Sequence, residues 1–164
     1  MLIGITCGGT DLVSRVVAAL DAGADVLVRE LEISAGLPLD RVILHARMPG
    51  AEQVARALHL SSDMQVAEVR RRFRGRLGYS AHTREDADRA YAAGADYVFL
   101  SPVFGKGDVA PIGLADVAGC VALGGVTPAR MRACLDAGAI GVAAMRGIFG
   151  AEDVAAAVRD YART

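Results

Sequence analysis

The chain has 164 residues, of which 53% are hydrophobic and 23% charged, and its formal net charge is −1. We expect residues 1–164 to form a single domain with an apolar core. The nearly neutral, interspersed charge argues against a general nucleic-acid surface and a basic membrane-binding face. No apolar run is long enough to cross a bilayer, no signal peptide is visible, and no cysteine belongs to a CxxC pair. These features predict a cytoplasmic protein with reduced cysteines.

Apolar segments alternate with helical segments along the whole chain. We predict strands near 2–6, 26–30, 41–46, 57–61, 76–80, 96–100, 120–124 and 140–145. We predict helices over 11–22, 50–57, 64–73, 83–93, 113–118, 128–137 and 151–162. Three alanine-rich segments end in Gly23, Gly94 and Gly138 before an apolar strand, which is typical of left-handed helix ends. Thr83 and Thr127 are the expected N-caps of the helices that follow them.

Eight strands that are apolar on both faces and alternate with helices favour a parallel sheet covered by helices. We therefore predict an α/β fold, a shortened (β/α)8 TIM-type barrel. An open doubly wound sheet is the alternative, because barrels usually need about 200 residues or more. Gly36 and Pro38 leave little room for a helix between Glu30 and Arg41, so we expect a thin wall near strands 2–4. A partner subunit covering that wall would make the protein a homo-oligomer.

Two glycine-containing loops follow the seventh and eighth predicted strands. In barrels of this kind ligands bind at the carboxyl ends of the strands, and phosphate is commonly held by these two loops. Gly124 and Gly125 let their backbone amides approach a phosphate, and the helix beginning at Pro128 adds its positive end. Arg146 and Gly147 occupy the matching place after strand 8. These residues predict a phosphate site, although a tight strand-to-helix turn would also explain the glycine pair.

Polar side chains follow the other strands at the same rim. Cations outnumber anions among them, which suits an anionic small molecule as partner. These candidates are Arg29, His45, Arg47, Asp63, Ser80, His82 and Lys106. Rim salt bridges would also explain Arg29 and Arg47, a helix cap would explain His82, and we interpret His59 as a core histidine. We interpret the basic run at 70–76 as the solvated end of a helix.

Four segments carry a resemblance to a known family. They read "LGYSAHTREDADRAYAAGADYVFLSPVFGK", "ALGGVTPARMRACLDAGAIGVAAMRGI", "VLVRE" and "LHLSSD". At these residues the chain resembles the thiamine phosphate synthase and thiazole tautomerase (TenI-like) superfamily. The resemblance implies a (β/α)8 barrel that acts in thiamine biosynthesis. The synthase of this superfamily joins hydroxymethylpyrimidine diphosphate to thiazole phosphate and releases pyrophosphate, with Mg²⁺ as cofactor.

The resemblance also implies roles for single residues. Gly124, Gly125 and the loop at Arg146 and Gly147 fall on the thiazole-phosphate site. Three further residues, Arg29, Ser80 and Lys106, fall on or near the diphosphate-binding positions. Asp63 lies within one register step of a metal-binding aspartate, so it is the candidate Mg²⁺ ligand.

The chain departs from the synthase pattern at several positions. Leu27 and Leu31 replace a glutamine and a lysine, and His45-Ala46 replaces Asn-Asp. The tautomerase pattern has a histidine where this chain has Pro102. His45 or His82 would then be the proton-transfer group. Three hypotheses follow: a synthase-type transferase with Ser80, Lys106 and His45 as catalytic residues, a thiazole phosphate tautomerase, or a non-catalytic binder of a phosphorylated thiazole or thiamine phosphate.

Overall fold

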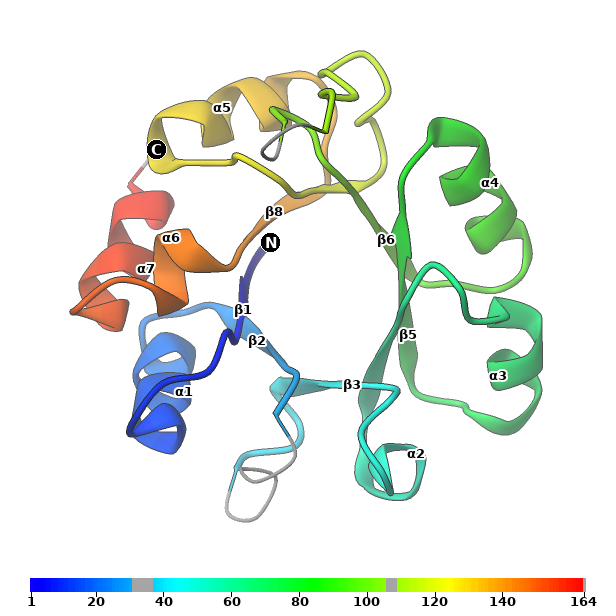
Figure 1. The fold of residues 1–164 in the computed structure, drawn as a ribbon, viewed down its shortest axis with the longest axis horizontal. Helices are drawn as coiled ribbons and strands as arrows, with labels where there is room; N and C mark the ends of the chain where they lie inside the picture. Colours follow the sequence, from blue (N-terminus) through cyan, green and yellow to red (C-terminus); the bar gives the residue numbers. More distant parts are fainter. Residues whose placement is uncertain (31–36, 106–108, 164) are drawn as a thin grey trace.

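The computed structural model describes residues 1–30, 37–105 and 109–163. Its strands form a closed barrel in which each strand pairs in parallel with its neighbours in sequence and β8 pairs with β1 (Figure 1). The eight strands are β1 Leu2–Ile5, β2 Asp25–Val28, β3 Val42–His45, β4 Ala57–Leu60, β5 Arg76–Ala81, β6 Tyr97–Leu100, β7 Val121–Ala122 and β8 Gly141–Ala144. The prediction of a (β/α)8 barrel is confirmed, and the open sheet is excluded by the pairing of β8 with β1.

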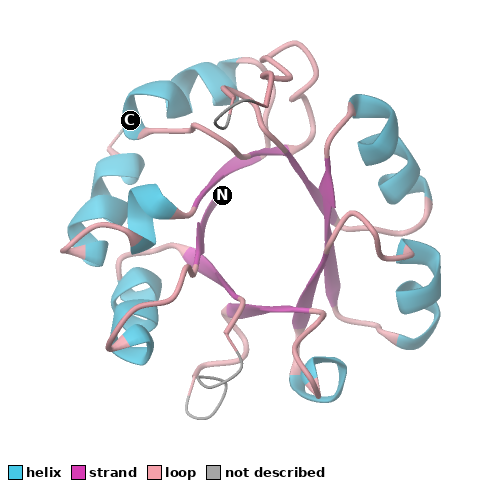
Figure 2. Ribbon diagram, viewed as in Figure 1, coloured by secondary structure: helices cyan, strands magenta, loops and turns pink. Residues whose placement is uncertain are grey.

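The helices lie outside the ring of strands (Figure 2). They are α1 Leu12–Asp21, α2 Ala51–Val54, α3 Val66–Arg72, α4 Arg84–Ala92, α5 Pro128–Asp136, α6 Arg146–Phe149 and α7 Val154–Ala162. The wall is thin where predicted, because described residues 29–30 and 37–41 form no helix and α2 has only 4 residues. None of the helices in the described residues is both long and apolar enough to cross a membrane.

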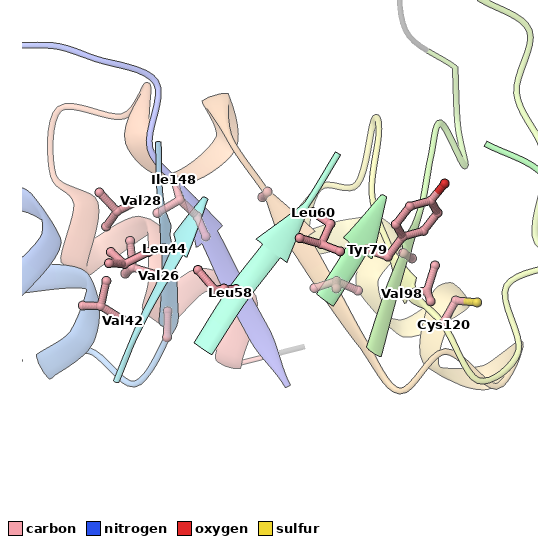
Figure 3. Packing of buried hydrophobic residues seen from close by; sticks show 14 of the residues in the cluster. Val26, Val28, Val42, Leu44, Leu58, Leu60, Tyr79, Val98, Cys120 and Ile148 are labelled. Atoms are coloured by element: carbon pink, nitrogen blue, oxygen red, sulfur yellow. The ribbon is translucent and has the colours of Figure 1, made fainter. Parts of the chain in front are cut away.

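Alternation along the strands sorts their side chains into two apolar clusters. On β3, Val42 and Leu44 pack between the sheet and the helices, whereas Ile43 points into the barrel. Figure 3 shows Val42 and Leu44 beside Val26 and Val28 of the neighbouring β2. The inner cluster fills the centre of the barrel with Ile3, Ile5, Leu27, Ile43, Tyr97, Phe99, Val121 and Ala143. A filled interior confines ligands to the open end of the barrel.

The predicted helix over 113–118 is wrong. Those residues form turns, because the amides of Ile112 and Gly113 donate to the carbonyls of Pro102 and Val103, at 2.8 and 3.1 Å. This pairing ties the segment to the loop after β6, so it cannot wind into a helix. The helical turn α6, directly after β8, was not predicted.

The three helix ends that glycines mark agree with the structure, whereas the helix predicted over 50–57 ends at Val54. Gly23, Gly94 and Gly138 follow α1, α4 and α5 with φ of 102°, 103° and 90°. The Thr83 side chain caps α4 by accepting a hydrogen bond from the Asp86 amide at 3.1 Å. Thr127 also occupies an N-cap position, but its side chain makes no capping hydrogen bond. Its hydroxyl therefore stays available at the open end of the barrel.

Candidate active site

A pocket of about 670 Å³ lies at the carboxyl ends of the strands. Every strand of the barrel contributes to its lining, through the strand itself or the loop that follows. The floor is apolar and the rim is polar. The lining includes eight residues that the sequence singled out, and Arg47 and Asp63 are not among them: Arg29, His45, Ser80, His82, Gly124, Gly125, Arg146 and Gly147. The structure thus brings most of the predicted site residues together.

The glycine pair after β7 lies on the pocket lining. Gly124 and Gly125 have φ of 91° and 69°, which other residues rarely adopt. A Cβ on Gly124 would lie 2.6 Å from the Pro102 Cα, and one on Gly125 would lie 2.9 Å from the Phe104 Cβ. Within the described residues neither amide N–H donates a hydrogen bond. Both amides are therefore available to a ligand beside the start of α5.

Tyr161 on α7 links the loops after β7 and β8. Its buried hydroxyl donates to the Val126 carbonyl at 2.9 Å. The same hydroxyl would lie 2.5 Å from a Cβ on Gly147, so that glycine is needed for space. Sequence reasoning missed this tyrosine, because nothing in the pattern of α7 distinguishes a helix residue that packs on the loops from one that packs on the sheet.

A second feature is the exposed guanidinium of Arg29 at the end of β2. The Arg29 amide donates to the Thr6 hydroxyl at 3.0 Å and to the Glu30 carboxylate at 3.2 Å. Glu30 also accepts hydrogen bonds from the Thr6 hydroxyl and, at 2.9 Å, from the Gly8 amide. Glu30 thus holds the loop after β1 by hydrogen bonds. Among the described residues no ion pair neutralises the Arg29 side chain. The Arg29 Nη1 donates to the Met145 Sδ at 3.5 Å, a weak acceptor that leaves the charge available to an anionic ligand.

The ends of β3 and β4 form a third group. Arg47 pairs with Asp63 and donates to the Ser61 hydroxyl at 3.1 Å. The Arg47 hydrogen bond lowers the pKa of Asp63, so this exposed carboxylate stays ionised. Partial burial, then Arg29 and Arg47, lower the pKa of the half-buried His45. His45 is consequently neutral near pH 7 and able to accept a proton. Arg47 thus forms a salt bridge at the rim, as the sequence allowed.

His59 lines the pocket, a position that its sequence context did not indicate. It is only 2% exposed, as expected of a core residue. Its Nε2 lies 2.8 Å from the Ser80 Oγ and its Nδ1 lies 3.2 Å from the Tyr97 hydroxyl. The alternation on β4 could have revealed this, because Leu58 and Leu60 face the helices and the residue between them must point into the barrel.

Burial of His59 makes the protein sensitive to acid. Burial, followed by the charge of His45, lowers the pKa of His59 from 6.5 to about 3. Between these values the unfolded chain binds a proton that the folded chain excludes, so stability falls as pH falls. We expect His59 to contribute a loss of about 2 kcal/mol in the free energy of unfolding between pH 7.5 and pH 5. Urea unfolding at both pH values measures it.

The control for this prediction compares two histidine variants. His59→Gln is expected to reduce the acid-induced loss of stability relative to the parent, whereas the same change at the exposed His82 is expected to leave it in place. An equal pH dependence in the parent and in His59→Gln would contradict the prediction. Carboxylates contribute equally to the pH dependence of stability in the parent and in His59→Gln, so their contribution cancels when the two proteins are compared.

The remaining candidates have separate outcomes. Lys106 and Leu31 lie outside the described residues. His82 does not cap α4 but donates from Nδ1 to the Ser101 carbonyl at 2.8 Å. In the basic run, Arg70 pairs with Asp96, and Arg72 and Arg76 pair with Glu52 and Asp25, respectively. Local ion pairs therefore use three of its charges.

Several known proteins are similar in sequence to this chain. The sequence profile of the family described as thiamine monophosphate synthase matches residues 40–148. A thiamine-phosphate synthase of Roseiflexus sp. is 37% identical over 181 aligned positions, covering 92% of this chain and 75% of the relative. One of Chloroflexus aurantiacus is 35% identical over 147 positions, covering 80% and 67%.

The fold is also similar to a solved structure. The thiamine phosphate pyrophosphorylase from Pyrococcus furiosus superposes with a TM-score of 0.80 at 24% identity, covering 99% of this chain and 93% of that one. The Roseiflexus alignment is longer than this chain, so that relative has segments that are absent here. The profile match and the relatives above 30% identity show that the chain belongs to the thiamine monophosphate synthase family.

Proposed function

We propose that this protein joins hydroxymethylpyrimidine diphosphate to thiazole phosphate, forming thiamine phosphate and releasing pyrophosphate. The single observation that carries the proposal is that one pocket is lined by two kinds of group that can bind an anion. One is the pair of Gly124 and Gly125 amides, and the other is the Arg29 guanidinium that no described ion pair neutralises. A reaction between two phosphorylated substrates needs two such groups. The family to which the chain belongs supports the same assignment.

The floor of the pocket suits a heteroaromatic ring. Ile5, Leu27, Phe99 and Leu123 line it with apolar surface. A pyrimidine ring lying there would place its methylene carbon between the diphosphate at Arg29 and the thiazole nitrogen. The carbon–oxygen bond then breaks with its electron pair leaving on the diphosphate, and the nitrogen lone pair forms the new carbon–nitrogen bond. Leu27 departs from the synthase pattern, and in this arrangement its apolar side chain packs against the pyrimidine ring.

The roles of the polar residues in this reaction are part of the proposal. Arg29 and Arg47 stabilise the leaving diphosphate, which gains charge as the bond breaks. Ser80 donates a hydrogen bond to the substrate. His45 is in reach of the same region and, being neutral, is suited to accept a proton. The Gly124, Gly125 and Gly147 amides together with Arg146 hold the thiazole phosphate.

The donor groups fit Mg²⁺ only as an ion shared with the substrate. Among the described residues no cluster of three histidine, cysteine, aspartate or glutamate side chains is arranged to hold a metal. Mg²⁺ is, however, commonly bound by one or two carboxylates with the remaining positions filled by phosphate oxygens and water. We propose that Asp63 provides that carboxylate beside the diphosphate, after release from Arg47. Bound there, the ion would neutralise charge on the leaving diphosphate.

Direct synthesis tests the proposed function. Purified protein is incubated with both substrates and Mg²⁺, and thiamine phosphate is measured by mass. Product is expected from the parent, and its rate is expected to fall by about 10²-fold or more in Gly124→Asp, because the new carboxylate repels the thiazole phosphate and clashes with Pro102. An arm with EDTA tests the metal, since Asp63 can be a ligand only if chelation slows the reaction.

Failure of this experiment has two distinct forms. Folded protein that binds thiazole phosphate but forms no product would support a non-catalytic binder. Folded protein that isomerises the thiazole phosphate in the presence of EDTA would instead support a tautomerase. Either result overturns the synthase assignment.

Two further proposals concern the setting of the protein. We propose that it works in the cytoplasm, which agrees with Cys7, Cys120 and Cys134 being free thiols. We also propose that it is a homo-oligomer in which a second copy covers the thin wall near β2–β4. The molar mass in solution by light scattering tests the second proposal.

A further inference from the structure

A line of three polar side chains crosses the barrel interior beneath the pocket. It runs from Tyr97 on β6 through His59 on β4 to Ser80 on β5, and these strands are neighbours in the sheet. Tyr97 and His59 are 1% and 2% exposed, and the rings of both pack against Phe99. Only His59 and Ser80 reach the pocket surface. The line therefore connects a buried phenol to a ligand-facing hydroxyl.

Two hydrogen-bond arrangements are compatible with these distances. In the first, the Tyr97 hydroxyl donates to Nδ1 of His59, whose Nε2–H donates to the Ser80 Oγ. In the second, Nδ1–H donates to the Tyr97 oxygen and the Ser80 hydroxyl donates to Nε2. Both require a neutral imidazole, which burial of His59 and the neighbouring His45 favour by lowering its pKa. The two arrangements give Ser80 opposite roles toward a ligand.

The surroundings of Tyr97 select the first arrangement. In the described part of the chain, the only hydrogen-bond partner of its hydroxyl is His59. In the second arrangement the phenolic hydrogen would be buried without an acceptor, which costs more than the hydrogen bond gained. In the first arrangement both buried donors, the Tyr97 hydroxyl and the His59 Nε2–H, have acceptors, and within the described residues the Ser80 hydroxyl hydrogen is left for a ligand. The pKa of Tyr97 is raised by burial, so its proton stays in place to be donated.

We propose that His59 is a positioning residue that, held by Tyr97 as the Nε2–H tautomer, fixes Ser80 as a hydrogen-bond donor to the substrate. Because the His59 Nε2–H donates to the Ser80 Oγ, the Ser80 hydroxyl hydrogen is left to point into the pocket. His59 cannot take a proton from Ser80, since the facing nitrogen already carries one. Ser80 is consequently a donor and not an activated nucleophile. The identity of the substrate atom that accepts this bond rests on the proposed function, but the tautomer does not.

Nitrogen NMR tests the tautomer without any activity. The protein is labelled with ¹⁵N-histidine, and His45→Gln and His82→Gln variants assign the other two rings. His59 is expected to show a protonated Nε2 and an unprotonated Nδ1 at pH 7. A protonated Nδ1, or a cationic ring, overturns the proposal whether or not the protein is a synthase.

Kinetics with two His59 variants test the positioning role. Glutamine carries both an acceptor and an amide donor, so His59→Gln can preserve the line, whereas His59→Leu fills similar space and cannot. We expect His59→Gln to stay within about tenfold of the parent in kcat/KM, and His59→Leu and Ser80→Ala to lose at least a further tenfold each. Thermal unfolding of each variant shows which of them are folded.

The outcomes separate this inference from the proposed function. A folded His59→Gln as inactive as His59→Leu overturns the positioning role, because a donor would then not suffice. If the parent forms no thiamine phosphate, the proposed function fails, and pyrophosphate binding by calorimetry replaces kcat/KM as the comparison among the same variants. Equal pyrophosphate affinity in the parent, Ser80→Ala and His59→Leu would then count against Ser80 as a donor to the diphosphate.

Discussion

Replacing Arg29 with alanine is expected to lower the rate of thiamine phosphate formation by about 10²- to 10³-fold. The guanidinium lies at the end of β2 on the pocket rim, and no described ion pair neutralises it. Its backbone is anchored through Thr6 and Glu30, so the side chain starts from a fixed position. Negative charge on the diphosphate increases as the carbon–oxygen bond breaks. We therefore expect Arg29→Ala to lower kcat by a larger factor than it raises KM.

Two variants make the Arg29 experiment selective. Arg29→Lys keeps the charge but loses the paired donors, so its rate is expected to lie between those of the parent and Arg29→Ala. Arg71→Ala removes an exposed arginine on α3, remote from the pocket, and is expected to keep the parent rate. Steady-state kinetics with pyrophosphate release as the signal measures all three. A rate for Arg29→Ala within twofold of the parent would show that the diphosphate is held elsewhere.

The barrel itself was predictable from local signals. The glycines that end α1, α4 and α5 marked where each helix feeds a strand, and they adopt the expected positive φ. Once the strands were placed, the rule that ligands bind at their carboxyl ends brought Arg29, Ser80 and Gly124 to one pocket. The site could be located because strand order alone determines which loops meet.

Contacts between distant side chains were not predictable in the same way. The turns at 113–118 follow from pairing with Pro102 and Val103, which no helix propensity reveals. The hydrogen bond from Tyr161 to Val126 spans 35 residues, and that between Tyr97 and His59 spans 38. Such contacts depend on the closed barrel, so only the three-dimensional structure shows that His59 reaches both Tyr97 and Ser80.

Replacing Gly78 with alanine is expected to destabilise the protein by about 3 kcal/mol or more. This glycine lies in β5 directly beside Tyr97 in the barrel interior, and an added Cβ would lie 2.1 Å from the Tyr97 Cζ and 2.4 Å from its hydroxyl. Tyr97 cannot move aside easily, because it is 1% exposed and hydrogen-bonded to His59. The Arg76 Cζ also lies over its ring, 4.6 Å from the ring centroid. Urea unfolding at pH 7.5 measures the loss.

A double variant shows whether the clash with Tyr97 is the cause. Tyr97→Leu removes the ring atoms that the new methyl group would strike, although it also removes the partner of His59 and is destabilising by itself. If the clash dominates, adding Gly78→Ala to Tyr97→Leu costs at least about 1 kcal/mol less than adding it to the parent, a coupling typical of residues in contact. Strictly additive losses would mean that Gly78 is required by the backbone of β5 and not by the space that Tyr97 occupies. The coupling would further show that the hydroxyl serving His59 sits where it does because β5 has no side chain at this position.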